Sequence, residues 1–107
     1  MEYAIENEYL IVTVTTWGAQ VKSVVRKFDD VEHMWQADKS VWGYHAPILF
    51  PHTGKVVDDL IETKGEVYQA KQHGFARLME HTLVRQTEDT IAVSYTHLRA
   101  HETLANL

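Results

Sequence analysis

The feature that most constrains the fold is an alternation of period two that recurs along most of the chain. It is clearest in residues 9–15, where Ile11 opens a run of β-branched side chains. Such side chains suit a pleated, half-buried surface, and alternation between two faces is typical of a strand. Similar runs occupy residues 3–6, 19–27, 33–35, 60–63, 66–70, 82–86 and 90–95. The pattern predicts an all-β chain of short antiparallel strands.

Turn signals separate these runs. Asn7-Glu8, Lys64-Gly65 and Glu88-Asp89 each divide two predicted strands and predict hairpins. Phe28-Asp29-Asp30 is a further predicted turn, and Asp38 is predicted to cap a single helical turn. Many short strands with turns at intervals of roughly eight to twelve residues indicate a sandwich or barrel.

Two segments interrupt the strand pattern. Residues 42–55 contain two glycines and two prolines, which exclude both a continuous helix and a central strand. Residues 72–77 place His73 and Arg77 beside a glycine and an aromatic ring. We expect both segments to be ordered, irregular and richer in functional groups than the strands.

The side chains in these segments suit a sugar ring, which has apolar C–H faces and polar edges. A pyranose site needs an aromatic platform and a few fixed polar groups. His73 can exchange a proton near neutral pH, and Arg77 can hold two oxygens at once. The alternative is that Phe50 and Phe75 fill the core while the prolines fix turns, and the residues alone favour this alternative. The candidate platform residues are Trp42, Tyr44, Phe50 and Phe75.

Charge and composition exclude several partners. A net charge of -5 without a Lys/Arg stripe argues against nucleic acid. The chain has no cysteine, so disulfides and thiolate zinc sites are excluded, and a reducing cytoplasm is the expected location. The first residues lack a basic start and a long apolar stretch, and no apolar run is long enough for a membrane span.

A metal site is the main alternative use of the seven histidines. His45 and His52 have no acidic residue nearby in the sequence. His97 and His101 lie in the last segment, residues 94–107, whose pattern differs from the rest of the chain. A closed site needs four converging ligands. We therefore expect no metal site.

Two motifs resemble a known family. Gln72-His73-Gly74-Phe75-Ala76-Arg77 resembles the HGFAR signature of the aldose 1-epimerase (galactose mutarotase-like) family. Residues 46–51 followed by Gly54-Lys55 resemble its APxLFPxxG(R/K) segment. Residues 5–10 and the Gly18-Ala19 turn are similar to the LacX-like bacterial branch. The resemblance covers residues 1–93, which correspond to the N-terminal portion of a family member.

The resemblance implies the N-terminal part of a large antiparallel β-sandwich, a supersandwich. It implies an isomerase that interconverts the α and β anomers of a hexose by acid–base ring opening, without a metal or cofactor. His73 would orient the sugar near its ring oxygen, and Arg77, His45, Phe75 and Phe50 would bind it. In the family, a second histidine acts as the acid and a glutamate acts as the base. Both belong to segments that this sequence does not contain.

These missing groups favour an inactive fragment. The alternatives are a non-catalytic carbohydrate-binding module and a relative of the hexose-6-phosphate mutarotases, in which Arg77 would help to hold the anion. Tyr44, His52-Thr53 and Lys55 depart from the family pattern and weaken the phosphate alternative. A sandwich that stops after its first strands is also expected to be marginally stable and prone to aggregation.

The last segment, residues 94–107, differs from the rest. Alternation fades after Tyr95, and leucines and His101 then recur at three-residue spacing, a faint helical pattern. The segment does not resemble the family and looks like a peptide that recurs at the ends of translated sequence fragments. We expect a domain of residues 1–93 followed by a non-native, disordered or weakly helical tail.

Overall fold

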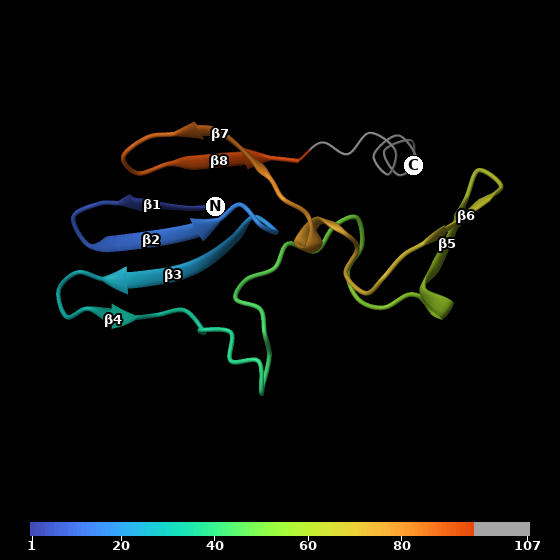
Figure 1. The fold of residues 1–107 in the computed structure, drawn as a ribbon, viewed down its shortest axis with the longest axis horizontal. Helices are drawn as coiled ribbons and strands as arrows, with labels where there is room; N and C mark the ends of the chain where they lie inside the picture. The colour runs from blue at the N-terminus through green and yellow to red at the C-terminus, as the bar shows by residue number, and fades with distance from the viewer. Residues whose placement is uncertain (96–107) are drawn as a thin grey trace.

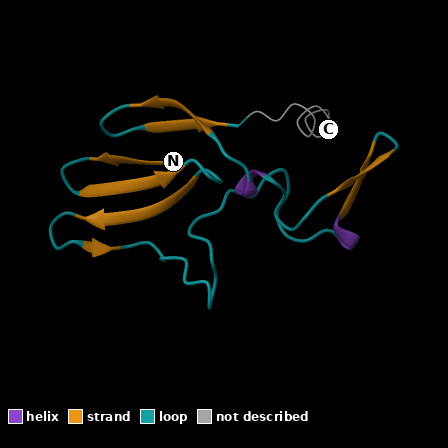
Figure 2. Ribbon diagram, in the orientation of Figure 1, coloured by secondary structure: helices purple, strands orange, loops and turns teal. Residues whose placement is uncertain are grey.

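The computed structural model describes residues 1–95 and consists of strands, turns and two short 3-10 helices (Figures 1 and 2). One antiparallel sheet has four strands in chain order, and two separate hairpins follow. This confirms the all-β prediction. The elements are β1 (Glu2–Glu6), β2 (Leu10–Thr15), β3 (Gln20–Arg26), β4 (Val31–Glu32), η1 (Val57–Asp59), β5 (Leu60–Thr63), β6 (Glu66–Gln69), η2 (Ala76–Leu78), β7 (Thr82–Gln86) and β8 (Ile91–Ser94).

The predicted hairpin turns form for local reasons. The Asn7 side-chain oxygen accepts hydrogen bonds from the backbone N–H groups of Tyr9 and Leu10, both at 2.8 Å, which closes the β1–β2 turn. Between β5 and β6, Lys64 and Gly65 both have positive φ, 51° and 80°. Two such residues form the turn that matches the twist of paired strands. Short-range side-chain chemistry therefore sets these connections.

The strand predicted around residues 33–35 is displaced to β4. The carboxylate of Glu32 accepts hydrogen bonds from the Ser23 hydroxyl and from the backbone N–H groups of Val24, at 2.8 Å, and Met34, at 3.2 Å. A side chain thus takes up backbone donors that a continued ladder would use, and the chain leaves the sheet after Glu32. At Asp38 the predicted cap forms: its side chain accepts the Ser40 N–H at 2.9 Å and closes a single turn.

The β7–β8 hairpin lies beside β1, so the end of the described chain returns to its beginning (Figure 1). The backbone N–H of Glu6 donates to the Glu88 carbonyl at 3.0 Å. The Gln86 side-chain amide donates to the Ala4 carbonyl, also at 3.0 Å. The β5–β6 hairpin projects from the opposite end of the molecule (Figure 1).

The interior is thin for a chain of this length. Only Val14, Ala70 and Ala76 are buried among the apolar residues that the structure describes. Within the same part of the chain, no helix is long and apolar enough to cross a membrane. Ser94 ends β8, whereas the helical pattern predicted from Leu98 onward lies outside the described residues. The division after residue 93 stays a prediction.

Candidate functional site

The two irregular segments interlock through their backbones. Phe50 and Gly74 form a parallel β-bridge. The Phe50 N–H donates to the His73 carbonyl at 3.2 Å. In return, the Phe50 carbonyl accepts the N–H groups of Phe75 at 2.9 Å and Ala76 at 3.2 Å. Two motifs more than twenty residues apart in sequence are thereby joined into one unit.

Glycine is required at the centre of this unit. Gly74 has a φ of +77°, and a Cβ atom built on it would lie 2.1 Å from the Phe50 carbonyl oxygen. That overlap is with backbone, which cannot rotate away. Gly74 therefore permits the close approach of the two segments.

His73 is held by a reciprocal pair of hydrogen bonds with Gly54. The Gly54 N–H donates to Nδ1 of the imidazole at 2.8 Å, and the His73 N–H donates to the Gly54 carbonyl at 2.9 Å. These bonds hold His73 in a left-handed conformation, with a φ of 64°, that few non-glycine residues adopt. The imidazole therefore has a defined orientation.

The hydrogen bond from the Gly54 N–H to Nδ1 also selects the tautomer of His73. Because a backbone N–H can only donate, Nδ1 carries its lone pair and the proton of the neutral ring sits on Nε2. The amide nitrogen of Gln72 lies 3.4 Å from Nε2, and the amide oxygen would accept the Nε2 proton only if the amide were flipped. The half-buried ring thus has its second nitrogen available as a donor.

Arg77 lies on an aromatic face. Its guanidinium carbon is 5.0 Å from the centroid of the Tyr44 ring, a cation–π distance, and one terminal nitrogen donates to the Gln72 carbonyl at 3.1 Å. The Tyr44 ring in turn contacts the Trp42 ring at a centroid separation of 5.9 Å. Arg77 therefore joins the second motif to the start of the first.

His45 is placed by its backbone. Its N–H and that of Ala46 both donate to the side-chain oxygen of Gln20, each at 3.0 Å. Gln20 is only 7% exposed, so this one buried amide anchors the loop to the start of β3. Among the described residues, no hydrogen bond or ring contact joins His45 to His73 or Arg77. The sequence did not single out Gln20, although a polar residue directly after a Gly-Ala turn at the start of a strand is a usable signal.

Phe50 and Phe75 pack edge to face, with centroids 6.1 Å apart. Phe75 also contacts the Tyr95 ring at 5.8 Å, whereas Phe50 is half exposed. Phe75 packs between the two segments, as expected for a core residue. Phe50 retains an open surface that a ligand could contact, as expected for a sugar platform.

A pocket of about 180 Å³ lies behind the interlocked segments, toward the β5–β6 hairpin. Pro51, His52, Gly74 and Phe75 are among its walls, but His73, Arg77 and His45 are not. Both ring nitrogens of His52 are buried without a hydrogen-bond partner in the described part of the chain. The pocket therefore shares Phe75 with the predicted site but does not include His73, Arg77 or His45.

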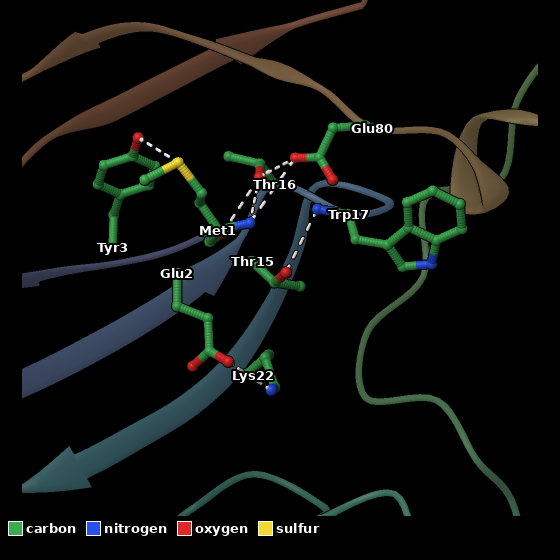
Figure 3. Close-up of polar contacts among 8 residues, drawn as sticks. All are labelled: Met1, Glu2, Tyr3, Thr15, Thr16, Trp17, Lys22 and Glu80. Atoms are coloured by element: carbon green, nitrogen blue, oxygen red, sulfur yellow. Dashed lines mark hydrogen bonds and ion pairs between the residues drawn. The ribbon is translucent and has the colours of Figure 1, made fainter.

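A second junction fixes this unit to the sheet (Figure 3). Trp17 and Glu80 form an antiparallel bridge, and the Thr16 hydroxyl donates to the Glu80 carboxylate. The Gly18 N–H donates to the Met79 carbonyl at 2.7 Å, and a Cβ atom on Gly18 would lie 2.6 Å from the Arg77 carbonyl oxygen. The β2–β3 turn thereby supports the backbone at Arg77.

Within residues 1–95, no three His, Asp or Glu side chains are grouped so that they could bind a metal ion. The two interlocked segments instead carry the imidazole of His73, bonded to Gly54, and the guanidinium of Arg77, placed over Tyr44.

This fold and this pair of interlocked motifs match an established family. The family described as aldose 1-epimerase matches residues 1–104, and the chain belongs to this family. The plasmid and chromosomal forms of protein LacX from Lactococcus lactis subsp. lactis are each 35% identical over 99 residues. That alignment covers 88% of this chain and 33% of the relative, so the chain spans about a third of the length of the curated relatives it matches.

Solved structures agree. A galactose mutarotase related enzyme from Lactobacillus acidophilus superposes with a TM-score of 0.85 at 40% identity, covering 87% of this chain and 31% of the other. A galactose mutarotase-like protein from Lactobacillus casei gives a TM-score of 0.87 at 30% identity, with 94% and 35% covered. The predicted galactose mutarotase-like fold is confirmed.

Proposed function

We propose that this chain is the N-terminal, sugar-orienting part of an aldose 1-epimerase acting on a hexose. The observation that carries the proposal is the reciprocal bonding between His73 and Gly54, which leaves Nε2–H as a fixed donor. A neutral N–H at this position can bind the ring oxygen of a pyranose and stabilise the negative charge that develops when the ring opens.

The neighbouring groups extend this proposed site. The exposed part of Phe50 offers an apolar surface to the C–H face of the sugar. Arg77 and His45 are the other proposed hydroxyl-binding residues, and Tyr44 holds the guanidinium of Arg77 in place. Epimerisation needs both a proton donor and a proton acceptor. In the described residues no carboxylate is hydrogen-bonded to His73. The acceptor is proposed to be a glutamate outside this chain, as the family resemblance implies.

A proton donor at His73 without an acceptor bonded to it supports a second candidate function. This function is carbohydrate binding without catalysis by this chain alone. Both candidates predict the same result when this chain alone is tested with fresh α-galactose or α-glucose, because the proton acceptor is proposed to lie outside it. Polarimetry with the 107-residue chain is expected to show mutarotation at the buffer rate, while ligand-observed NMR shows sugar contact. Acceleration by this chain alone would contradict the binding-only role, and an absence of contact with either sugar would contradict both candidates.

A hexose 6-phosphate is the less supported ligand. Arg77 already has its guanidinium on Tyr44 and a terminal nitrogen on the Gln72 carbonyl, so a phosphate would have to compete with both contacts. A preference for glucose 6-phosphate over glucose in the same NMR measurement would reverse this ranking. The cytoplasmic location stays a prediction from composition.

A further inference from the structure

The turn that carries His73 also places Gln72. The Gly74 N–H donates to the Lys71 carbonyl at 2.9 Å, which closes the turn around these two residues. The φ of 64° at His73, the third residue of the turn, is typical of a type II turn. The Gln72 carbonyl also accepts a hydrogen bond from Arg77 at 3.1 Å. The backbone is therefore held at both residues whose side chains reach the proposed sugar site.

Two nitrogen atoms that can donate lie next to each other at this turn. The Gln72 amide nitrogen is 3.4 Å from Nε2 of His73. Nε2 carries a proton because Nδ1 accepts the Gly54 N–H, and an amide NH2 group can only donate. Neither group can therefore satisfy the other. A single ligand oxygen can lie about 2.9 Å from both nitrogens and accept a hydrogen bond from each.

The exposed Gln72 amide has a second possible orientation. A half-turn would place its oxygen beside Nε2 and satisfy the imidazole proton without a ligand. Because Gln72 is exposed, water can bond to whichever end of the amide faces outward. An oxygen bound at Nε2 is repelled by the amide oxygen and attracted by the amide NH2. A bound ligand therefore selects the orientation that presents two donors.

We propose that Gln72 is a second donor to the ring oxygen of the sugar, beside His73. This inference rests on the proposed function and adds a binding residue to the same site. The ring oxygen of a pyranose accepts hydrogen bonds and has no proton to donate, so it matches a pair of donors. When the ring opens, the charge that develops on this oxygen is stabilised by both N–H groups. Gln72 thus makes the site selective for the ring atom.

The selectivity is measured with two sugars that differ only at that atom, D-glucose and 5-thio-D-glucose. A thioether sulfur is a weak acceptor, while the hydroxyl groups of the two sugars are the same. Ligand-observed NMR with the 107-residue chain is expected to show that glucose binds about tenfold more tightly than 5-thioglucose.

Gln72→Met removes the amide and keeps a side chain of similar length, while the backbone carbonyl that Arg77 contacts remains. We expect glucose affinity to fall about fivefold and 5-thioglucose affinity to change by no more than about twofold. Gln72→Glu should weaken glucose binding at least as much, because a carboxylate accepts the Nε2 proton. The matched control is Gln69→Met at an exposed glutamine of β6, which should leave both affinities unchanged.

A measurement on the unmodified chain covers the case in which Gln72→Met fails to fold. In an isotope-labelled sample, the side-chain NH2 signals of Gln72 should shift when glucose is added, and those of Gln69 should not. The same signals should shift much less with 5-thioglucose. A Gln72 signal that ignores glucose, while the sugar still binds, would overturn the proposal.

The variants also separate this inference from the proposed function. Glucose binding that falls in His73→Asn but not in Gln72→Met would overturn the role of Gln72 and leave the proposed function standing. Tighter glucose binding in Gln72→Met would show that the amide oxygen holds the Nε2 proton, which also overturns it. An equal loss for both sugars would place Gln72 away from the ring atom and reject the assignment. No glucose contact in the unmodified chain would overturn both.

Discussion

His73 and Gly54 exchange two hydrogen bonds, one from the Gly54 N–H to the imidazole at 2.8 Å and one from the His73 N–H to the Gly54 carbonyl at 2.9 Å. A backbone amide thereby selects both the orientation and the tautomer of a histidine that the sequence identified only by its motif. The donor is a backbone N–H at a glycine whose φ of +84° other residues rarely adopt, and substitutions of His73 would remove the acceptor.

This relationship predicts that His73→Asn separates loop structure from ligand binding. The asparagine oxygen can accept the Gly54 N–H, but nothing then replaces Nε2–H. We expect sugar affinity to fall by about tenfold, the value of one hydrogen bond of roughly 1.4 kcal/mol, with stability little changed. Ligand-observed NMR and urea unfolding measure the two effects. His73→Leu serves as the comparison and should reduce both quantities; unchanged sugar contact in His73→Asn would remove His73 from the site.

Gly74→Ala should prevent the two segments from interlocking. The added Cβ meets the Phe50 carbonyl oxygen at 2.1 Å, in addition to the cost of a left-handed alanine. Gly65→Ala provides the control, because Gly65 also has positive φ but a Cβ atom added there would have no heavy atom within 4 Å. We expect Gly65→Ala to cost about 1–2 kcal/mol and Gly74→Ala clearly more, as measured by urea unfolding. Equal costs would mean that the close approach does not form.

Gln20→Leu should release the loop that contains His45. It leaves the N–H groups of His45 and Ala46 without their shared acceptor, at a cost of about 1–3 kcal/mol. Hydrogen exchange at these two amides is expected to accelerate. Gln20→Glu keeps a side-chain oxygen in the same place and should preserve slow exchange. Fast exchange in the original chain would show that the anchor is absent.

Acid should loosen the β3–β4 connection, whereas neutral pH should leave it intact. The hydroxyl of Ser23 chiefly, together with backbone N–H groups of Val24 and Met34, lowers the pKa of Glu32 below its ordinary value of 4.5, against an opposing effect of desolvation. A lowered folded pKa means that the stabilisation is complete above that ordinary value and is lost as pH falls through the folded pKa. Exchange at the Val24 and Met34 amides should therefore rise only in that acidic range. Glu32→Gln should show little pH dependence there, and an identical acid response would assign the effect to another group.

Much of the fold could be predicted because its causes are local. Alternating β-branched residues indicate strands wherever they occur, and Asn7 and Lys64-Gly65 close their turns with groups one to three residues away. The prediction of a strand at residues 33–35 is wrong because the pattern could not show that the Glu32 side chain would bond to the backbone of Val24. Side-chain competition of this kind depends on which strand lies alongside.

The sequence by itself determined that the chain is all-β and that its hairpins turn where they do, and it predicted functional groups in residues 42–55 and 72–77. Only the tertiary structure decided that His73 bonds to Gly54, that Arg77 lies on Tyr44, and that Gln20 anchors His45. Alternation and turn residues act over a few positions, whereas these contacts join segments separated by some twenty residues or more. They arise only once a close backbone approach, permitted by Gly74 and Gly18, has brought those segments together.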